Sequence, residues 1–279
     1  MTYKTILVHL DQVSRAQERI RIAADLAVAG DAHLIGAAMI GISTLTFDRS
    51  HIEEKDPALA SHLAFLRERA RGFSADFESI AQQRGVLSYE GRVVDGEAGY
   101  GICLQARYCD LVVLGQANLN DPSPLVGSDF PESVLINGGR PVLIVPNDRQ
   151  FAGMGKKVLI SWNASREATR AVTDAIPILK AADIVQVAVF NVDPRSDSHG
   201  ERAGDDVALF LARHGINVDV LPAQRSRNIG NDLLSEINTL SSDLLVMGGY
   251  GHTRFREFLV GGVTRTILDQ AGIPVLMSH

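Results

Sequence analysis

The hydrophobic positions of the chain alternate between two patterns. Short unbroken apolar runs are typical of strands covered on both faces, and apolar residues spaced three and four apart are typical of helices with one buried face. In the second half, the runs predict strands at 158–162, 184–192, 218–221, 244–247 and 274–277. The helical spacing predicts helices at 168–179, 205–214, 231–240 and 263–270.

The same order of elements is present twice, because the chain resembles itself at a nearly fixed distance. The segment KTILVHLD at 4–11 aligns with KKVLISWN at 156–163, an offset of 152. The segment DLVVLG at 110–115 aligns with DLLVMG at 243–248, an offset of 133. The first copy therefore holds about 19 additional residues (152 minus 133), which we place around 44–62.

Two copies imply two domains, at 1–148 and 156–279, joined by the polar, glycine-bearing linker 147–155. The alternation predicts an α/β fold in each, a doubly wound five-stranded parallel sheet with helices on both faces. In such sheets a ligand binds beyond the carboxyl ends of the strands, where the strand order reverses. For the order 3-2-1-4-5 that point lies between strands 1 and 4.

Several helix details follow from single positions. Ser165 is predicted to cap a helix N-terminus, and Ser14 with Gln17 is predicted to form a capping box. Residues 62–80 are amphipathic and predict a helix that faces the core of the first domain. The last strand of each copy, 141–145 and 274–277, would form a sheet edge, and bare edges are normally covered.

A glycine-rich stretch follows strand 4 of the second copy. Gly248 and Gly251 come directly after the strand, and Gly261 and Gly262 precede the last helix. Glycine lets backbone approach a ligand closely, and a helix N-terminus presents free N–H groups to an anion. The spacing is suited to binding phosphates, and the alternative is two ordinary glycine turns around a helix.

Composition restricts the class of protein. The chain has 279 residues, 46% of them hydrophobic, and a net charge of −6, which argues against wide nucleic-acid or anionic-membrane surfaces. No apolar run reaches the length of a membrane span. The only cysteines, Cys103 and Cys109, form no CxxC pair, so we expect buried thiols and a cytoplasmic setting.

The repeat and the pattern G-x2-G-x9-G resemble the universal stress proteins, and the tandem two-domain type is the nearer match. The resemblance implies a stress-response protein that binds ATP or a related adenine nucleotide in its C-terminal domain. It also implies that paired domains meet through their last strands, here as an intramolecular pseudo-dimer, with a homodimer also open. The nucleotide-binding residues that it implies are Asn163, Val192, Gly248, Gly251, Gly261, Gly262, Val263 and Thr264.

Two departures mark the second copy. Gly262 stands where the family often has Ser or Thr, which removes a hydroxyl from the phosphate site. Asn163 replaces the usual Asp, so a carboxylate for a divalent cation is missing and the involvement of Mg²⁺ is in doubt.

The first copy departs further. Asn118 and Ser128 replace two of the three glycines, and Asp129 adds negative charge. We expect this copy not to bind ATP in the family manner, which leaves another ligand or a structural role.

Other candidate sites are weaker. Neither GxGxxG nor a Walker sequence is present. No nucleophile or general base stands out, so we expect binding with little or no hydrolysis and no catalytic residue. The alternatives are a slow nucleotide hydrolase and an interaction protein that binds another anionic metabolite. Minor candidates are His252, Arg225 and Arg227 near the phosphates, and metal patches at 51–54 and 197–201.

Overall fold

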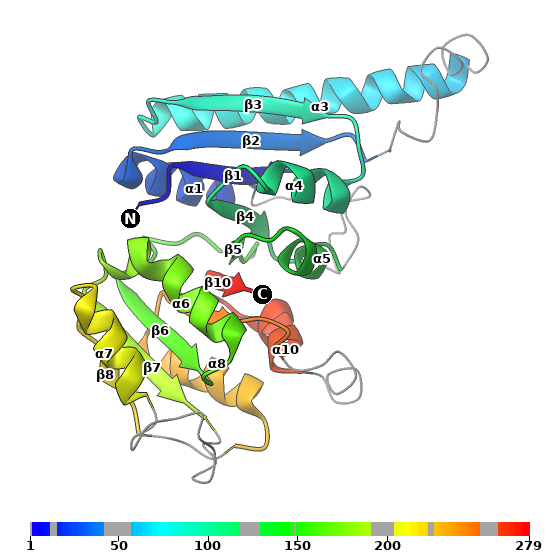
Figure 1. Ribbon diagram of the computed structural model, residues 1–279. Helices are drawn as coiled ribbons and strands as arrows, with labels where there is room; N and C mark the ends of the chain where they lie inside the picture. Colours follow the sequence, from blue (N-terminus) through cyan, green and yellow to red (C-terminus); the bar gives the residue numbers. More distant parts are fainter. Residues whose placement is uncertain are drawn as a thin grey trace. The chain divides into compact units, whose positions relative to one another are not determined.

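A computed structural model describes residues 2–11, 16–41, 57–117, 129–147, 149–190, 204–222, 226–251 and 262–279. The chain forms two compact units. The N-terminal unit comprises Thr2–Arg140 with Asn147–Arg149, and the C-terminal unit comprises Pro141–Pro146 with Gln150–His279. Each unit has a mostly parallel arrangement of strands with helices packed on it (Figure 1), which confirms the predicted α/β class.

The N-terminal unit contains four strands that pair in parallel. β1 lies between β2 and β4, and β3 pairs with the outer side of β2. With β5 as the fifth strand, the first repeat has the predicted order 3-2-1-4-5. The elements of this unit are β1 (Thr5–Leu10), α1 (Ala16–Gly30), β2 (His33–Met39), α3 (Pro57–Gln83), β3 (Tyr89–Val94), α4 (Ala98–Ala106), β4 (Leu111–Gly115) and α5 (Phe130–Asn137).

The C-terminal unit repeats this arrangement. β6 lies between β7 and β9, and β10 pairs in parallel with β9. Its other edge pairs antiparallel with β5 (Val142–Val145), the last strand of the first repeat. The elements are β6 (Lys157–Trp162), α6 (Arg166–Leu179), β7 (Ile184–Val189), α7 (Asp205–Arg213), β8 (Asp219–Val220), α8 (Ile229–Leu240), β9 (Leu244–Gly248), α10 (Val263–Gln270) and β10 (Val275–Ser278).

The central strands explain why their sequences are unbroken apolar runs. Leu7, Val113, Leu159 and Val246 are fully buried, because helices cover both faces of each sheet. The predicted strands were correct in order and kind. The edge strand β8 is shorter than the predicted strand at 218–221, since it has two residues. β7 ends at Val189, and residues 191–192 of its predicted range lie outside the described ranges.

The additional length of the first repeat lies mainly in a helix. α3 has 27 residues and its counterpart α7 has 9, a difference of 18. We placed this length at 44–62, of which residues 44–56 lie outside the described ranges. The prediction of a core-facing helix is confirmed, because Leu63, Leu66 and Phe77 are buried.

Two glycines allow α3 to lie close to the sheet. A Cβ on Gly36 of β2 would lie 2.6 Å from the ring of Phe77, and one on Gly91 of β3 would lie 1.9 Å from Oγ of Ser74. A side chain at Gly36 would push the ring of Phe77 away from the sheet, and one at Gly91 would require the hydroxyl of Ser74 to move.

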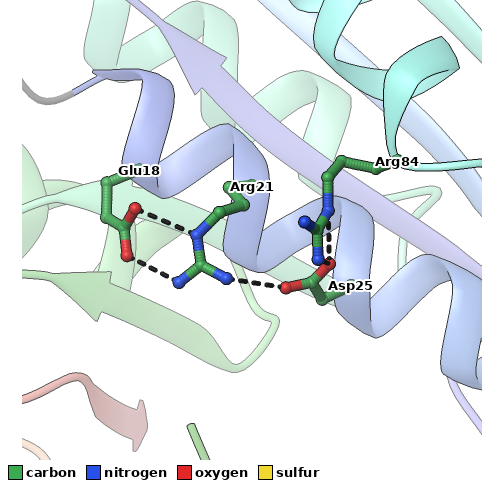
Figure 2. Close-up of polar contacts among 4 residues, drawn as sticks. All are labelled: Glu18, Arg21, Asp25 and Arg84. Carbon is green, nitrogen blue, oxygen red and sulfur yellow. Dashed lines mark hydrogen bonds and ion pairs between the residues drawn. The ribbon is translucent and has the colours of Figure 1, made fainter. Parts of the chain in front are cut away.

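A chain of ion pairs links α1 to the end of α3 (Figure 2). Arg21 donates to both carboxylate oxygens of Glu18 at 3.0 and 2.6 Å and to Asp25 at 2.8 Å. Arg84, directly after α3, donates from Nε to the other oxygen of Asp25 at 2.8 Å. The hydrogen bond to Glu18 raises the pKa of the Arg21 guanidinium.

The repeated aspartate before strand 4 has the same role in both units. The carboxylate of Asp110 accepts from the amides of Lys4 and Thr5, at 2.7 and 3.0 Å. The carboxylate of Asp243 accepts from three amides, those of residues 155, 156 and 157, at 2.9 to 3.0 Å. These contacts hold the first strand of each unit beside the fourth and account for the DLVVLG and DLLVMG match.

Candidate functional site

The candidate site lies at the carboxyl ends of β6 and β9. These two strands are neighbours, and Ser161 pairs with Met247 one step before the strands end. α6 begins directly after β6, and α10 is the next described helix after β9. The strand order reverses between β6 and β9, as predicted for a ligand-binding crevice.

Asn163 follows β6 and shapes the turn into α6. Its Oδ1 accepts from the amide of Ser165 at 3.1 Å, and Ala164 between them has a left-handed φ of 57°. Ser165 then caps α6, because its Oγ accepts from the amide of Ala168 at 3.1 Å. The predicted N-cap is therefore confirmed, and the side-chain oxygen of Asn163 is used to build the turn.

Gly248 and Gly251 pack against the start of α6. A Cβ on Gly248 would lie 2.5 Å from the amide nitrogen of Ala168, and a Cβ on Gly251 would lie 2.5 Å from Oε2 of Glu167. The missing side chain of Gly248 makes room for the backbone of α6, and that of Gly251 makes room for the carboxylate of Glu167. This is a physical reason for both glycines that does not require a ligand, and it was not part of the sequence-based interpretation.

Glu167 is a residue of the site that sequence reasoning missed. It is the second residue of α6, it is 6% exposed, and Oε2 faces the backbone of Gly251. Its ion-pair partner is Arg166, at 3.6 Å, whose own side chain is 94% exposed. The signal available in the sequence was an acidic residue in the first turn of the helix that follows strand 1.

Thr264 connects the glycine stretch to the last helix. Its Oγ1 accepts from the amide of Tyr250 at 3.3 Å, and its side chain is 3% exposed. Tyr250 has a left-handed φ of 56°. The hydroxyl of Thr264 is therefore directed to the loop.

The N-terminus of α10 has no side-chain cap. Gly262 occupies the N-cap position with φ −62° and ψ 158°, and it has no hydroxyl or carboxylate to accept from the first amides of the helix. α10 is held closely on α8, because a Cβ on Gly230 would lie 2.8 Å from Cβ of Thr266. The first amides of α10, beginning with Val263, thus retain the capacity to bind an acceptor, and the helix dipole favours an anion there.

Several predicted residues lie outside the described ranges. They are Val192, Gly261, His252, Arg225, Asn118, Ser128, Ser14 and the two metal patches. Arg227 is described, and it is exposed just before Asn228, the N-cap of α8. Within the ranges that can be described, no group of three His, Cys, Asp or Glu side chains could hold a metal ion.

The equivalent place in the N-terminal unit is filled by the protein itself. Arg19 of α1 is 1% exposed, and its Nη2 donates to Oδ1 of Asp11 at 2.7 Å. A Cβ on Gly115, at the end of β4, would lie 2.1 Å from Nη1 of Arg19 and 2.9 Å from Oδ1 of Asn147. The guanidinium therefore lies between the carboxyl ends of β1 and β4, directly against the first glycine position.

A histidine and a phenylalanine complete this buried cluster. The ring of His9 lies 4.7 Å from the ring of Phe130, the first residue of α5. Nδ1 of His9 lies 3.5 Å from Oδ2 of Asp11. Burial lowers the pKa of His9 from 6.5 to about 4, with Asp11 opposing the shift and Arg19 adding to it.

The second repeat has none of these groups at the matching positions. At the offset of 152, Arg19 corresponds to Ala171 and Asp11 to Asn163. At the offset of 133, Phe130 corresponds to Val263, and Pro131, which lacks an N–H, corresponds to Thr264. The two units thus differ in the side chains near the carboxyl ends of these strands, as well as in their glycines.

The two cysteines lie in the N-terminal unit. Cys103 and Cys109 are both buried, as predicted, and unpaired with each other. Burial raises the thiol pKa of both residues, to about 11 for Cys109. In the part of the chain that can be described, no helix has the length and apolar character needed to cross a membrane.

Comparison with known proteins is consistent with the repeat and the fold. The profile of the universal stress protein family matches twice, over residues 2–146 and 154–279. The universal stress protein Slr1230 of Synechocystis sp. is 28% identical over 149 residues, which are 52% of this chain and 49% of that protein. The matched region thus spans about half the length of this relative.

Two solved structures have the same fold over nearly the whole chain. A universal stress protein from Archaeoglobus fulgidus has a TM-score of 0.74 at 15% identity, with 98% of this chain and 94% of that chain covered. A putative universal stress protein from Pseudomonas aeruginosa has a TM-score of 0.58 at 18% identity, with coverage of 98% and 92%.

Proposed function

Because the chain belongs to the universal stress protein family, we propose that it is a cytoplasmic stress-response protein whose C-terminal domain binds ATP or a related adenine nucleotide. The observation that carries this proposal is the N-terminus of α10. It has no side-chain cap, and the hydrogen bond between Thr264 and Tyr250 ties it to the loop that leaves β9.

In this proposal the phosphates bind to backbone amides and not to side chains. The amide of the N-cap Gly262 and the first amides of the helix, those of Val263 and Thr264, lie at this end of α10, so an anion there gains hydrogen bonds and the favourable end of the helix dipole. Gly248, Gly251 and Gly261 are assigned to the loop around the phosphates. Asn163 is assigned to the ribose, and the backbone near Val192 to the base.

The proposed activity is binding without efficient turnover. Hydrolysis of a nucleotide needs an activated water, and usually a divalent cation held by carboxylates. Asn163 carries no charge, and its Oδ1 already accepts from Ser165. We assign no catalytic residue and no resident metal.

The N-terminal domain is assigned a structural role. Its crevice contains the Arg19–Asp11 pair, which supports a domain that keeps its shape without a nucleotide. We further propose that the two domains form a pseudo-dimer through their last strands. The antiparallel pairing of β5 with β10, in which Ile144 faces Val275 and Val142 faces Met277, supports this assignment.

A pair of substitutions at Gly262 tests the nucleotide site. Gly262→Asp places a carboxylate at the N-cap of α10, which stabilises the helix and repels phosphate. Gly262→Ser adds a neutral hydroxyl at the same position. Calorimetric titration with ATP should show binding to the wild type and to Gly262→Ser, and a loss of at least about tenfold in affinity for Gly262→Asp.

Because Asp favours a helix N-terminus, loss of binding in Gly262→Asp cannot be attributed to an unfolded α10, and circular dichroism checks this directly. Equal affinities of the two variants for ATP would show that phosphate does not bind at the N-terminus of α10. The absence of heat with ATP, ADP and AMP would reject nucleotide binding and favour an interaction protein.

A further inference from the structure

A buried carboxylate lies beside the loop that the proposed nucleotide would contact. Oε2 of Glu167 would be 2.5 Å from a Cβ on Gly251, and its Cδ would be 3.1 Å from the same point. The residue is 6% exposed, so little water surrounds its charge. Tyr250, which precedes Gly251, donates a backbone hydrogen bond to Oγ1 of Thr264 in α10. Two successive loop residues, Tyr250 and Gly251, thus contact the N-terminal turn of α10 and the carboxylate of Glu167, respectively.

Among the residues that the structure describes, the charge of Glu167 is only weakly balanced. Arg166 is its ion-pair partner among the described residues, at 3.6 Å from Oε1, and the Arg166 side chain is 94% exposed. An exposed partner at this distance is well screened by water and can turn away. Oε2, on the other side of the carboxylate, faces the glycine loop.

We propose that Glu167 sets the charge selectivity of this site, so that it favours adenine ligands with few phosphates and accepts ATP best when a divalent cation neutralises the phosphates. This inference rests on the proposed nucleotide-binding function. Each additional phosphate brings negative charge close to a buried carboxylate, and repulsion between like charges is strong where water is excluded. The amides of α10 attract the first phosphate, and Glu167 opposes the next ones.

A purely structural role for Glu167 predicts a different outcome. An acidic residue in the first turn of α6 stabilises that helix through its dipole. Losing this stabilisation would change the affinities of all adenine ligands by the same factor. Charge selectivity changes the ratio of the affinities for ATP and AMP, so the ratio separates the two roles.

The test uses the intact chain and three proteins: wild type, Glu167→Gln and Asp183→Asn. Asp183→Asn is the control, because this substitution removes the same charge at the opposite end of the same sheet. The Asp183 side chain is 71% exposed there. Affinities for ATP, ADP and AMP are measured calorimetrically, once with EDTA and once with Mg²⁺.

Without metal, Glu167→Gln should bind ATP about tenfold more tightly than the wild type and AMP less than about threefold more tightly. With Mg²⁺ the gain for ATP should shrink, and Asp183→Asn should behave as the wild type. Equal changes for ATP and AMP would overturn the inference and leave nucleotide binding intact. A loss of Mg²⁺-dependent ATP binding in Glu167→Gln would also overturn it, since the carboxylate would then be a metal ligand. If none of the three nucleotides binds any of the three proteins, the proposed function and this inference both fail.

Discussion

Replacing Arg19 by methionine leaves the buried carboxylate of Asp11 without its guanidinium partner. The two groups are 2.7 Å apart, with side-chain exposures of 1% and 8%. Removing one member of a buried ion pair costs about 3 to 5 kcal/mol, because the remaining charge stays out of water. We therefore expect Arg19→Met to lower the free energy of unfolding by about 3 kcal/mol or more at pH 8.

The loss should be smaller at lower pH. With Arg19 absent, His9 can take up a proton and pair with Asp11, whose Oδ2 lies 3.5 Å from Nδ1. Protonated His9 would then replace part of the missing charge. The destabilisation caused by Arg19→Met should thus decrease between pH 8 and pH 5.

Urea unfolding followed by circular dichroism and by the fluorescence of Trp162 measures this effect. Trp162 is the single tryptophan and lies in the C-terminal unit, so the two signals together separate the units. The matched control is Arg84→Met, because Arg84 pairs with Asp25 at the surface and such pairs contribute about 0 to 1 kcal/mol. An Arg19→Met protein as stable as Arg84→Met at pH 8 would refute the buried-pair account.

Three further predictions follow from single contacts. Because the pKa of His9 falls from 6.5 to about 4 on folding, the unfolded chain binds more protons than the folded chain between these pH values. The free energy of unfolding should therefore decrease by up to about 3 kcal/mol as pH falls from 7 to 4. Urea titrations of His9→Gln should lose this pH dependence. Asp243→Ala removes the acceptor of three amides at the start of β6 and should cost about 2 kcal/mol in urea unfolding; an unchanged midpoint would mean that water replaces the carboxylate. Gly36→Ala should lower the melting temperature, because its Cβ would lie 2.6 Å from the ring of Phe77. Gly72→Ala should raise the melting temperature slightly, because nothing lies within 4 Å of a Cβ at this position and alanine favours a helix.

The fold could be predicted from the sequence because its local and global signals agree. The apolar runs of β1, β4, β6 and β9 are buried on both sides, and the match of DLVVLG with DLLVMG reflects a contact that both units use. The length of the edge strand β8 could not be predicted. It is the last strand of the sheet and pairs with β7, so its ends depend on pairing and not on its own hydrophobicity.

The charged residues of the two crevices were harder to predict. Arg19 and Glu167 lie in helices that also carry exposed or partly exposed charges, such as Arg21 and Arg166, and a charged residue is normally read as exposed. Their burial depends on where α1 and α6 begin relative to the strands. The glycines of the C-terminal crevice were correctly singled out, but for an incomplete reason. Gly248 and Gly251 are in contact with α6, which the spacing of the motif alone does not reveal.

The central claim is that the N-terminus of α10 binds a phosphate-bearing adenine ligand and that the corresponding end of α5 does not. Amide chemical-shift mapping of the ¹⁵N-labelled intact chain during titration with ATP, in the presence of Mg²⁺, tests this most directly. We predict the largest shifts at the amides of Gly262, Val263 and Thr264, with Phe130 and Gly115 unchanged. Shifts confined to the start of α5, or no shift at any of these amides at saturating ATP, would contradict the account.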